Sequence, residues 1–255
     1  MSKKIISLIM LGAFILSFGL VGCGKQAAPT AKILRVGSEA AFAPFEFQDE
    51  KSKEYTGFDM DLIRALGKQM GYEVQIQNMG FDGLIPALEA GNIDVAISAM
   101  TITPERSKKV NFSKPYYKSG LTMVVKSDNT AIKSFKDLEG KNIAVQLGTT
   151  GADEAKKVKD AKIREFNSAP EAFMELKAGG VDAVVNDKPV NDYYITKAGG
   201  KDAKTVGEPL TSEEYGIATA QKNKELAENL SKALDELKKN GEYDKIYVKW
   251  FGQKS

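Results

Sequence analysis

Apolar positions recur along the chain in two patterns, one typical of amphipathic helices and one typical of short buried strands. Apolar residues three and four positions apart predict a helix that ends at Gly71 and a long helix over residues 226–237. Short apolar runs predict strands at 33–37, 74–76, 93–97, 141–146 and 181–185. Strands and helices that follow one another in this way predict an α/β fold.

One phrase of this pattern occurs twice at a constant offset (176 − 88 = 88), as LEAGNIDVAIS over residues 88–98 and LKAGGVDAVVN over residues 176–186. Each copy predicts a helix end, a glycine just beyond it and a strand covered on both faces. Two copies so far apart indicate two similar lobes, because a solenoid needs at least three short repeats. Chance similarity between two βα units is the alternative interpretation.

Polar residues follow both copies of the predicted strand. Ser98 and Thr101 follow the first copy, and Asn186 and Asp187 follow the second. Ligands of open α/β sheets bind at the carboxyl ends of the strands. We therefore expect a binding cleft between the two lobes.

Two extended apolar segments, Leu121–Val125 and Tyr215–Ala220, are candidate crossings between the lobes. Two crossings predict a double-stranded hinge, which permits closure around a ligand. We expect residues 32–120 and 217–255 to form a discontinuous first lobe. Residues 121–216, with the hinge crossings, would form the second lobe.

The N-terminal residues have the pattern of a bacterial lipoprotein signal. Lys3 and Lys4 precede an apolar stretch that is rather short for a transmembrane anchor, the alternative interpretation. Cleavage before Cys23, the only cysteine, would remove residues 1–22 and leave a lipid-anchored tether over residues 23–31. The predicted location is extracytoplasmic, at the cell membrane.

Charge and composition exclude several classes of function. The chain has 36 basic and 34 acidic residues, and loss of Lys3 and Lys4 leaves 36 − 2 = 34 of each. A balanced charge does not favour nucleic acid or an anionic membrane surface as a partner. The absence of histidine and the single cysteine exclude a zinc site and a histidine-based triad. We expect no metal, no cofactor and a monomer.

Several motifs in order resemble the extracytoplasmic solute-binding proteins of polar amino acid ABC importers. They are VGSEAAFAPFEF at 36–47, GFDMDL at 57–62, AMTITPER at 99–106, FSKPYY at 112–117 and YVKWFG at 247–252. The resemblance covers nearly the whole mature chain. It implies a two-lobed type II periplasmic-binding fold and an ABC permease as partner. The most similar members bind glutamine, arginine, lysine or histidine, or cystine.

Arg106 is the predicted ligand of an amino acid carboxylate. Thr103 fits a helix N-cap and Pro104 the first helical position, so that Arg106 lies at a positive helix start. A guanidinium can donate two parallel hydrogen bonds to a carboxylate. The resemblance implies the same role, and a surface arginine is the alternative. Thr101, Thr150 with the start of its helix, and the backbone at Ala99 would add hydrogen bonds to the ligand carboxylate.

Asp187 is the residue that the resemblance implies for the ligand ammonium, together with the backbone at Ala99. The alternative is that Asp187 only caps the following helix. Because Arg106 and Asp187 would come from different lobes, a bound ligand would bridge them and favour the closed state.

The remaining predicted site residues would contact the ligand side chain. Phe42 and Phe81 match an aromatic pair that suits a guanidinium or a planar amide, and Met100 is expected beside them. Glu39 argues against acidic ligands. Because Gln146 is neutral and does not neutralise Glu39, arginine or lysine is favoured over glutamine. Glu39 stands at a position that is often aspartate in the family. Because glutamate is longer than aspartate, it would shorten the pocket, which would instead suit a smaller or cystine-like ligand.

Two other functions compete with transport. Cyclohexadienyl dehydratase, an enzyme of this fold, needs a carboxylic acid free to give a proton, and Glu39 is the only candidate because Asp187 is assigned to the ammonium. A ligand-sensing domain of a larger receptor is the third possibility. We expect a binding protein and not an enzyme.

Overall fold

The computed structural model describes residues 32–199 and 201–252 of the 255-residue chain. The predicted signal peptide and tether, with Cys23, lie outside the described residues. Within the described part, no helix combines the length and the apolarity that a membrane crossing requires.

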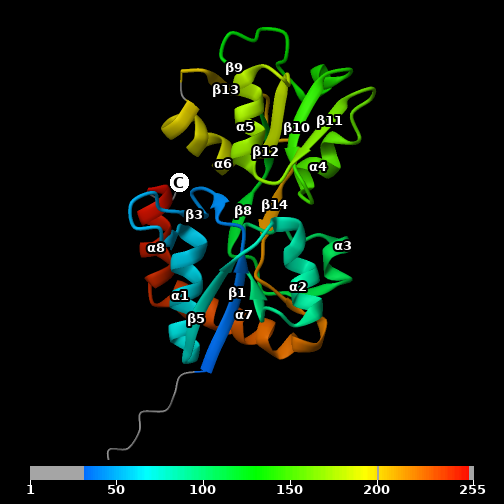
Figure 1. Cartoon of the computed structure of the whole chain (residues 1–255). Coiled ribbons are helices and arrows are strands. Elements are labelled where there is room, and N and C mark those ends of the chain that lie inside the picture. Colours follow the sequence, from blue (N-terminus) through cyan, green and yellow to red (C-terminus); the bar gives the residue numbers. More distant parts are fainter. Residues whose placement is uncertain (1–31, 200, 253–255) are drawn as a thin grey trace, which may run out of the picture. The chain divides into compact units, whose positions relative to one another are not determined.

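The first lobe is built on a five-stranded sheet of order β5–β1–β6–β15–β7 (Figure 1). Strands β1, β5 and β6 are parallel, and β15 is antiparallel to both of its neighbours. The strands are β1 (Lys32–Ser38), β5 (Tyr72–Asn78), β6 (Val95–Ala96), β7 (Val110–Phe112) and β15 (Ala218–Ala220). A small sheet beside it contains β2 (Ala41–Phe42), β3 (Glu46–Gln48) and β4 (Tyr55–Thr56).

Helices cover both faces of this sheet, as the continuous apolar run at 93–97 predicts. Val95 and Ala96 of β6 belong to separate apolar clusters, one shared with α1, α7 and α8 and the other with α2. The helices of this lobe are α1 (Phe58–Met70), α2 (Leu84–Ala90), α3 (Pro104–Ser107), α7 (Lys224–Lys239) and α8 (Glu242–Phe251), with short turns η1 (Phe81–Gly83) and η4 (Gln221–Asn223).

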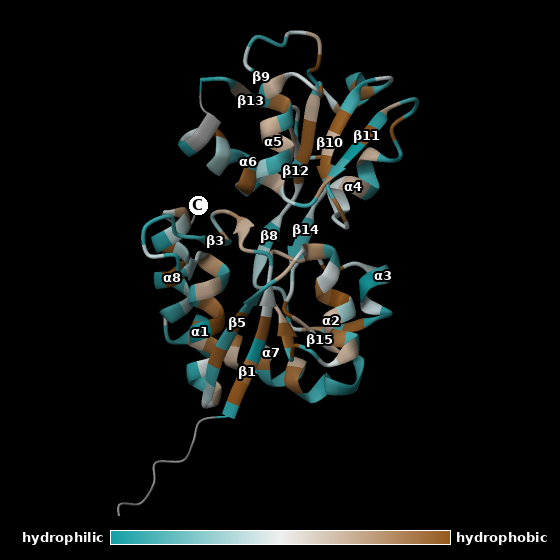
Figure 2. Ribbon diagram, in the orientation of Figure 1, coloured by the Kyte–Doolittle hydropathy of each residue, from teal (hydrophilic) through white to brown (hydrophobic). Residues whose placement is uncertain are grey.

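The second lobe repeats the design with a sheet of order β11–β10–β12–β9–β13. Its strands are β9 (Leu121–Lys126), β10 (Asn142–Gln146), β11 (Lys162–Phe166), β12 (Ala183–Asp187) and β13 (Ala203–Val206). Its helices are α4 (Thr150–Ala155), α5 (Ala169–Ala178) and α6 (Lys188–Tyr194), with η2 (Phe135–Leu138) and η3 (Ile195–Gly199). Apolar residues are concentrated in inner strands such as β1, β10 and β12, whereas the edge strand β11 is largely hydrophilic (Figure 2).

The repeated phrase has the same local structure in both lobes. α2 ends at Gly91 and α5 at Gly179, both in the left-handed conformation. The strands that follow, β6 and β12, begin two residues later than predicted, after Asp94 and Asp182. Each of these aspartates instead accepts a backbone N–H at the neighbouring strand, from Arg35 at 2.9 Å and from Asn142 at 2.8 Å.

The hinge consists of the antiparallel strands β8 (Tyr117–Ser119) and β14 (Glu213–Tyr215). The prediction that Leu121–Val125 crosses between the lobes is wrong, because this run lies in β9, between β12 and β13. A continuous apolar run suits a sheet interior covered on both faces. The return crossing, predicted over Tyr215–Ala220, occurs earlier, in β14, and β15 already belongs to the first-lobe sheet.

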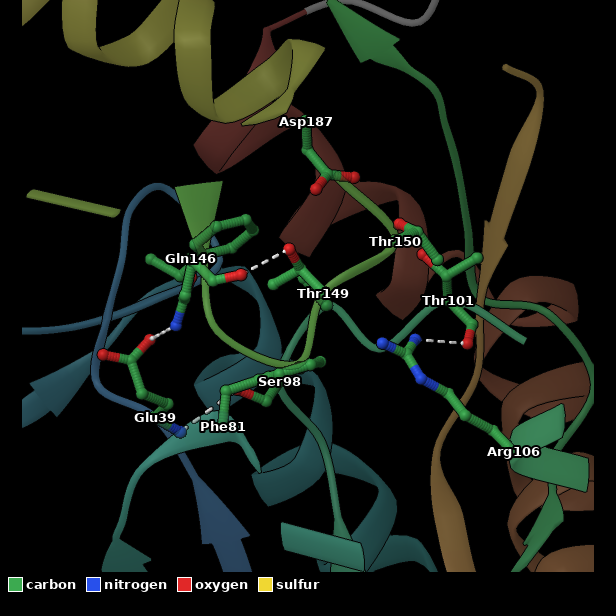
Figure 3. Close-up of a pocket in the computed structure, with 11 residues that line it drawn as sticks. Glu39, Phe81, Ser98, Thr101, Arg106, Gln146, Thr149, Thr150 and Asp187 are labelled. Carbon is green, nitrogen blue, oxygen red and sulfur yellow. Dashed lines mark hydrogen bonds between the residues drawn. The ribbon is translucent and has the colours of Figure 1, made fainter. Parts of the chain in front are cut away.

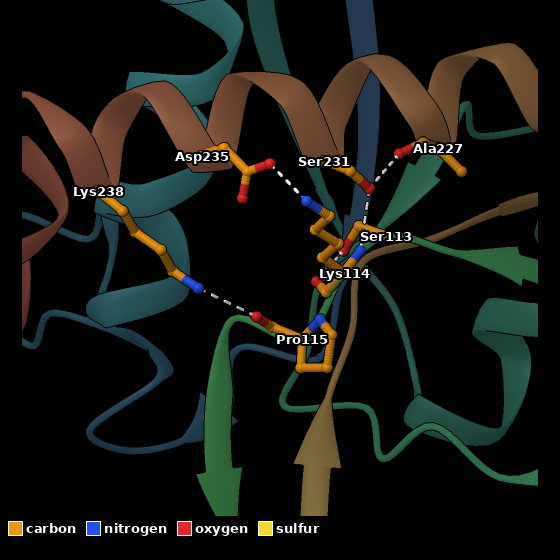
Figure 4. A network of polar contacts seen from close by, with 7 residues as sticks. All are labelled: Ser113, Lys114, Pro115, Ala227, Ser231, Asp235 and Lys238. Atoms are coloured by element: carbon orange, nitrogen blue, oxygen red, sulfur yellow. Dashed lines mark hydrogen bonds and ion pairs between the residues drawn. The ribbon is translucent and has the colours of Figure 1, made fainter.

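The segment that precedes β8 is held to α7 by hydrogen bonds and an ion pair (Figure 4). The Lys114 backbone N–H donates to Ser231 Oγ at 2.9 Å, and its ammonium pairs with Asp235. Lys238 Nζ donates to the Pro115 carbonyl at 3.3 Å. These contacts hold the chain on the first lobe up to Pro115, so that bending is left to the two hinge strands.

Candidate functional site

A cavity lies where the strand ends of both lobes meet (Figure 3). The empty space there, including space open to solvent, is about 270 Å³. Nine of its lining residues were predicted from the sequence: Glu39, Phe42, Phe81, Ala99, Thr101, Arg106, Gln146, Thr150 and Asp187. Ser98 and Thr149 complete the lining.

Arg106 spans the cleft from the first lobe to the second. The turn that carries it is capped as predicted, since the Thr103 side chain accepts the Arg106 N–H at 3.1 Å. The guanidinium donates to the Thr101 carbonyl at 2.7 Å and to the Gly148 carbonyl at 3.0 Å. Its carbon lies 5.3 Å from the centroid of the Phe81 ring. Phe81 therefore supports the arginine as well as lining the cavity.

Asp187 faces the cavity from the end of β12 and is buried. It occupies the N-cap position of α6, yet its side chain makes no cap hydrogen bond with the described residues. Its Oδ1 accepts hydrogen bonds from Ser119 at 3.1 Å and from Tyr215, both on hinge strands. Burial, and then the charge of Glu213, raise the pKa of Asp187 to about 7. A cation placed in the cavity would restore its ionised form.

Glu39 forms another acidic corner of the cavity, next to Gln146 (Figure 3). Its carboxylate accepts a 3.3 Å hydrogen bond from Gln146 Nε2, which also donates to the Asn167 carbonyl at 3.2 Å. Burial raises the pKa of Glu39 to about 7, and the hydrogen bond from Gln146 offsets this only in part. A neutral amide is thus the group that stabilises the Glu39 charge in the closed cleft.

Two buried carboxyl groups support the floor of the cavity. Ser98 Oγ accepts the Glu39 N–H at 3.1 Å and donates to Glu46 Oε1 at 3.0 Å. The Ala99 N–H donates to Asp59 Oδ2 at 2.8 Å, and this holds Ala99 in a left-handed conformation with φ 45°. Burial, then the charge of Asp59, raise the pKa of Glu46 well above its ordinary value. Ionisation of Asp59 therefore disfavours ionisation of Glu46.

The threonines of the site meet at a residue that sequence reasoning missed. Thr101 of the first lobe donates its hydroxyl proton to Glu213 at 2.7 Å, and Thr150 of the second lobe does so at 3.1 Å. Glu213 is buried on the hinge strand β14. The alternation of a strand places Glu213 on the same face as Tyr215, and this signal would have indicated it.

Thr149 is the N-cap of α4, with its side chain accepting the Ala152 N–H at 3.2 Å. Met100 does not lie among the described residues that line the cavity. Its side chain belongs to the apolar cluster of Leu84 and Leu88, because successive residues of an extended segment point in opposite directions. The prediction that Met100 contacts the ligand is therefore not supported by its position. Within the described part of the chain, no group of three or more acidic or sulfur-bearing residues is arranged to hold a metal ion.

The fold and the site together define a two-lobed, hinge-bending binding protein whose cleft carries charges of both signs. The family of bacterial extracellular solute-binding proteins, family 3, matches residues 34–253. The chain belongs to this family, whose members share the type II periplasmic-binding fold. This confirms the resemblance to the solute-binding proteins of polar amino acid importers.

The chain is similar to proteins with several assigned ligands. It is 35% identical to the arginine-binding extracellular protein ArtP of Bacillus subtilis, over 96% of this chain and 97% of that protein. The solved structure of an ancestral arginine-binding protein bound to glutamine is 50% identical, with a TM-score of 0.84, over 87% of this chain and 98% of that one. An ancestral amino acid-binding protein described as a precursor of cyclohexadienyl dehydratase is 46% identical, with a TM-score of 0.80, over 86% and 95%.

Proposed function

We propose that this protein captures a polar L-amino acid, with arginine or lysine favoured, and delivers it to an ABC permease. One observation carries the proposal: Arg106 of the first lobe and Asp187 of the second face the same small cavity. A free amino acid carries a carboxylate for the former and an ammonium for the latter. Each charge of the ligand would then be paired, which a water-poor cleft requires.

The direction of the hydrogen bonds from Thr101 and Thr150 indicates which charge of the ligand head group these residues would contact. A hydroxyl has one proton, and both threonines donate theirs to Glu213. Their oxygens therefore face the cavity as acceptors, which suits the ligand ammonium. The ligand carboxylate is left to Arg106, with backbone N–H groups of the cleft as further donors.

Glu39 supports a cationic ligand side chain. It remains after the head group is paired, and Phe42 and Phe81 line the cavity with it. A guanidinium between aromatic rings and a carboxylate combines cation–π attraction with an ion pair. Glutamine and cystine remain the alternative ligands, and the structure of an arginine-binding relative with glutamine bound supports the first of these.

An elimination reaction of the dehydratase type is the second candidate function. The similarity to a precursor of cyclohexadienyl dehydratase favours it, as does the pKa of Glu39 near 7, which suits a general acid. The relatives named above with assigned ligands are binding proteins, and we therefore favour transport.

A screen of the purified protein against all twenty amino acids, ornithine and cystine tests this proposal. The protein is first unfolded and refolded to remove any carried ligand. A ligand at a hundred times its Kd adds about 2.7 kcal/mol to the free energy of unfolding. We expect the largest thermal shift with arginine or lysine. A shift with glutamine or cystine alone would overturn the cationic preference. Aromatic product from prephenate or arogenate, with no thermal shift, would establish the enzyme instead.

The location that we propose is extracytoplasmic, with a lipid anchor on Cys23. The family consists of extracellular proteins, and the signal pattern before Cys23 supports lipidation. We expect Cys23→Ala to move the protein from the membrane fraction to the soluble extracytoplasmic fraction, as measured by immunoblot of fractionated cells. Equal membrane retention of wild type and Cys23→Ala would contradict the anchor.

A further inference from the structure

Glu213 lies at the point where the hinge meets both walls of the cleft. It is 7% exposed and accepts hydroxyl protons from Thr101 at 2.7 Å, from Thr150 at 3.1 Å and from Thr211 at 3.1 Å. Thr101 lies between β6 and α3 of the first lobe and pairs with Tyr215 of β14, whereas Thr150 opens α4 of the second lobe. One carboxylate on the hinge therefore joins a segment of the first lobe to a helix of the second.

We propose that Glu213 is a positioning residue that latches the closed cleft and orients the Thr101 and Thr150 hydroxyl oxygens toward the ligand ammonium. The inference rests on the proposed function, since it concerns the same cavity. Both hydrogen bonds can form together only when the two lobes are closed. Opening the cleft carries Thr150 away from Thr101, so that at least one of these bonds must break.

The neighbouring residue on the hinge offers a matched control. Glu214 follows Glu213 on β14 and is exposed, because successive strand residues point to opposite faces. It lies with Lys118 and Tyr117 in a groove on the other side of the hinge strands. Substitution of Glu214 removes the same charge from the same strand without touching the cleft.

Hydrogen bonds to a charged acceptor contribute more than neutral ones. Loss of the latch should therefore favour the open form and shorten the lifetime of the closed complex, because affinity differences in related complexes come mostly from dissociation. A merely structural Glu213 would instead lower the stability of the ligand-free protein and leave the closed complex unchanged.

The test measures arginine binding by calorimetry and stopped flow in wild type, Glu213→Ala, Glu213→Gln and Glu214→Ala. We expect at least tenfold weaker binding for Glu213→Ala, through faster dissociation, and less than a twofold change for Glu214→Ala. Glu213→Gln should recover part of the loss, because its amide oxygen still accepts a hydroxyl proton. The loss of arginine affinity caused by Glu213→Ala should be at least threefold smaller in a Thr150→Val background than in wild type. Equal effects in both backgrounds, or affinity within twofold of wild type, would overturn the proposal.

Small-angle scattering of the ligand-free proteins separates this inference from the proposed function. We expect a larger radius of gyration for Glu213→Ala than for wild type and Glu214→Ala, since the open form is favoured. This arm needs no ligand. A wild type that binds no amino acid would contradict the proposed function, whereas identical radii would contradict the latch. If Glu213→Ala does not fold, Glu213→Gln takes its place in both arms.

Discussion

At the scale of single residues, the proposed function assigns a separate role to each charge of the cleft. Arg106 and Asp187 match the two charges that all amino acids share, so they cannot discriminate among them. Glu39 is the charged group left for the side chain, and a neutral amide is its hydrogen-bond partner. Selection between cationic and neutral side chains is therefore assigned to Glu39.

The pKa of Glu39 predicts how this selection depends on pH. Burial raises it from 4.5 to about 7. Well below pH 4.5 the group is protonated in both folded and unfolded protein, and its contribution to the free energy of unfolding is fully present. Between pH 4.5 and about 7 the unfolded chain releases this proton while the folded protein keeps it, so that stability falls as pH rises and levels off above 7. A cationic ligand side chain reverses this effect by pairing with the carboxylate.

We therefore expect the preference for arginine over citrulline, its neutral isostere, to increase as pH rises. The ratio of the citrulline Kd to the arginine Kd should increase about tenfold between pH 6 and pH 8, because Glu39 passes from mostly protonated to mostly ionised. Asp187 also titrates near pH 7, but it faces the ammonium that both ligands carry, so its effect cancels. Calorimetry at several pH values measures the ratio. A ratio independent of pH in wild type, or equally dependent in Glu39→Gln, would contradict this role.

Sequence reasoning found most of the residues that line the cavity because they follow strands or open helices. It missed Glu213, whose importance depends on two threonines that are 49 residues apart in the chain (150 − 101 = 49). It also assigned Phe81 to the ligand alone, although the ring lies against Arg106. The Thr150–Glu213 contact depends on how the lobes meet, and the Phe81–Arg106 contact on how two segments of the first lobe pack. No local pattern in the sequence specifies either.

At the scale of elements, the repeated phrase, residues 88–98 and 176–186, forms the same local structure in both lobes. A glycine ends each helix, and an aspartate three residues later accepts a backbone N–H of the neighbouring strand. The helix, the glycine and the strand could be predicted from hydropathy. The strand starts were predicted two residues early. At Asp94 and Asp182 the side chains bond to the neighbouring strand, and the regular backbone pairing of the sheet begins only after them.

The loop between β10 and α4 contacts the first lobe at a glycine, Gly148. Gly148 has φ +77°, and a Cβ there would lie 3.2 Å from the Cβ of Asp82 in the first lobe. Its carbonyl accepts a hydrogen bond from Arg106. With a side chain at residue 148, Asp82 would have to shift by a few tenths of an ångström for the two lobes to approach this closely.

We expect Gly148→Ala to lower the free energy of unfolding by about 1–2 kcal/mol through left-handed strain and to weaken arginine binding several-fold by hindering closure. Gly140→Ala is the matched control, since Gly140 has φ +69° but nothing within 4 Å of its Cβ position. It should show the same loss of stability without a loss of affinity. Thermal unfolding and calorimetry measure the two effects. Equal loss of affinity in both variants would show that backbone strain, not closure, is responsible.

At the scale of the whole molecule, the proposed function depends on two lobes that close on a ligand. The motifs in the sequence predicted the family and the two-lobed fold, and both are confirmed. The position of the hinge was predicted incorrectly, because an apolar run was taken for a crossing. The actual crossings carry Ser119, Glu213 and Tyr215, whose polar groups bind residues of the cleft.

The central claim is that one charge from each lobe holds the ligand, and removal of Arg106 tests it most directly. Arginine is titrated calorimetrically into wild type, Arg106→Ala and the control Arg64→Ala, which alters an exposed arginine of α1. Thermal unfolding without ligand checks that each variant is folded. Truncation of one partner of a buried charge pair costs about 2–5 kcal/mol, so we expect Arg106→Ala to bind roughly 30-fold more weakly or not at all, and Arg64→Ala to bind as wild type does. A folded Arg106→Ala protein with affinity within threefold of wild type would contradict the clamp.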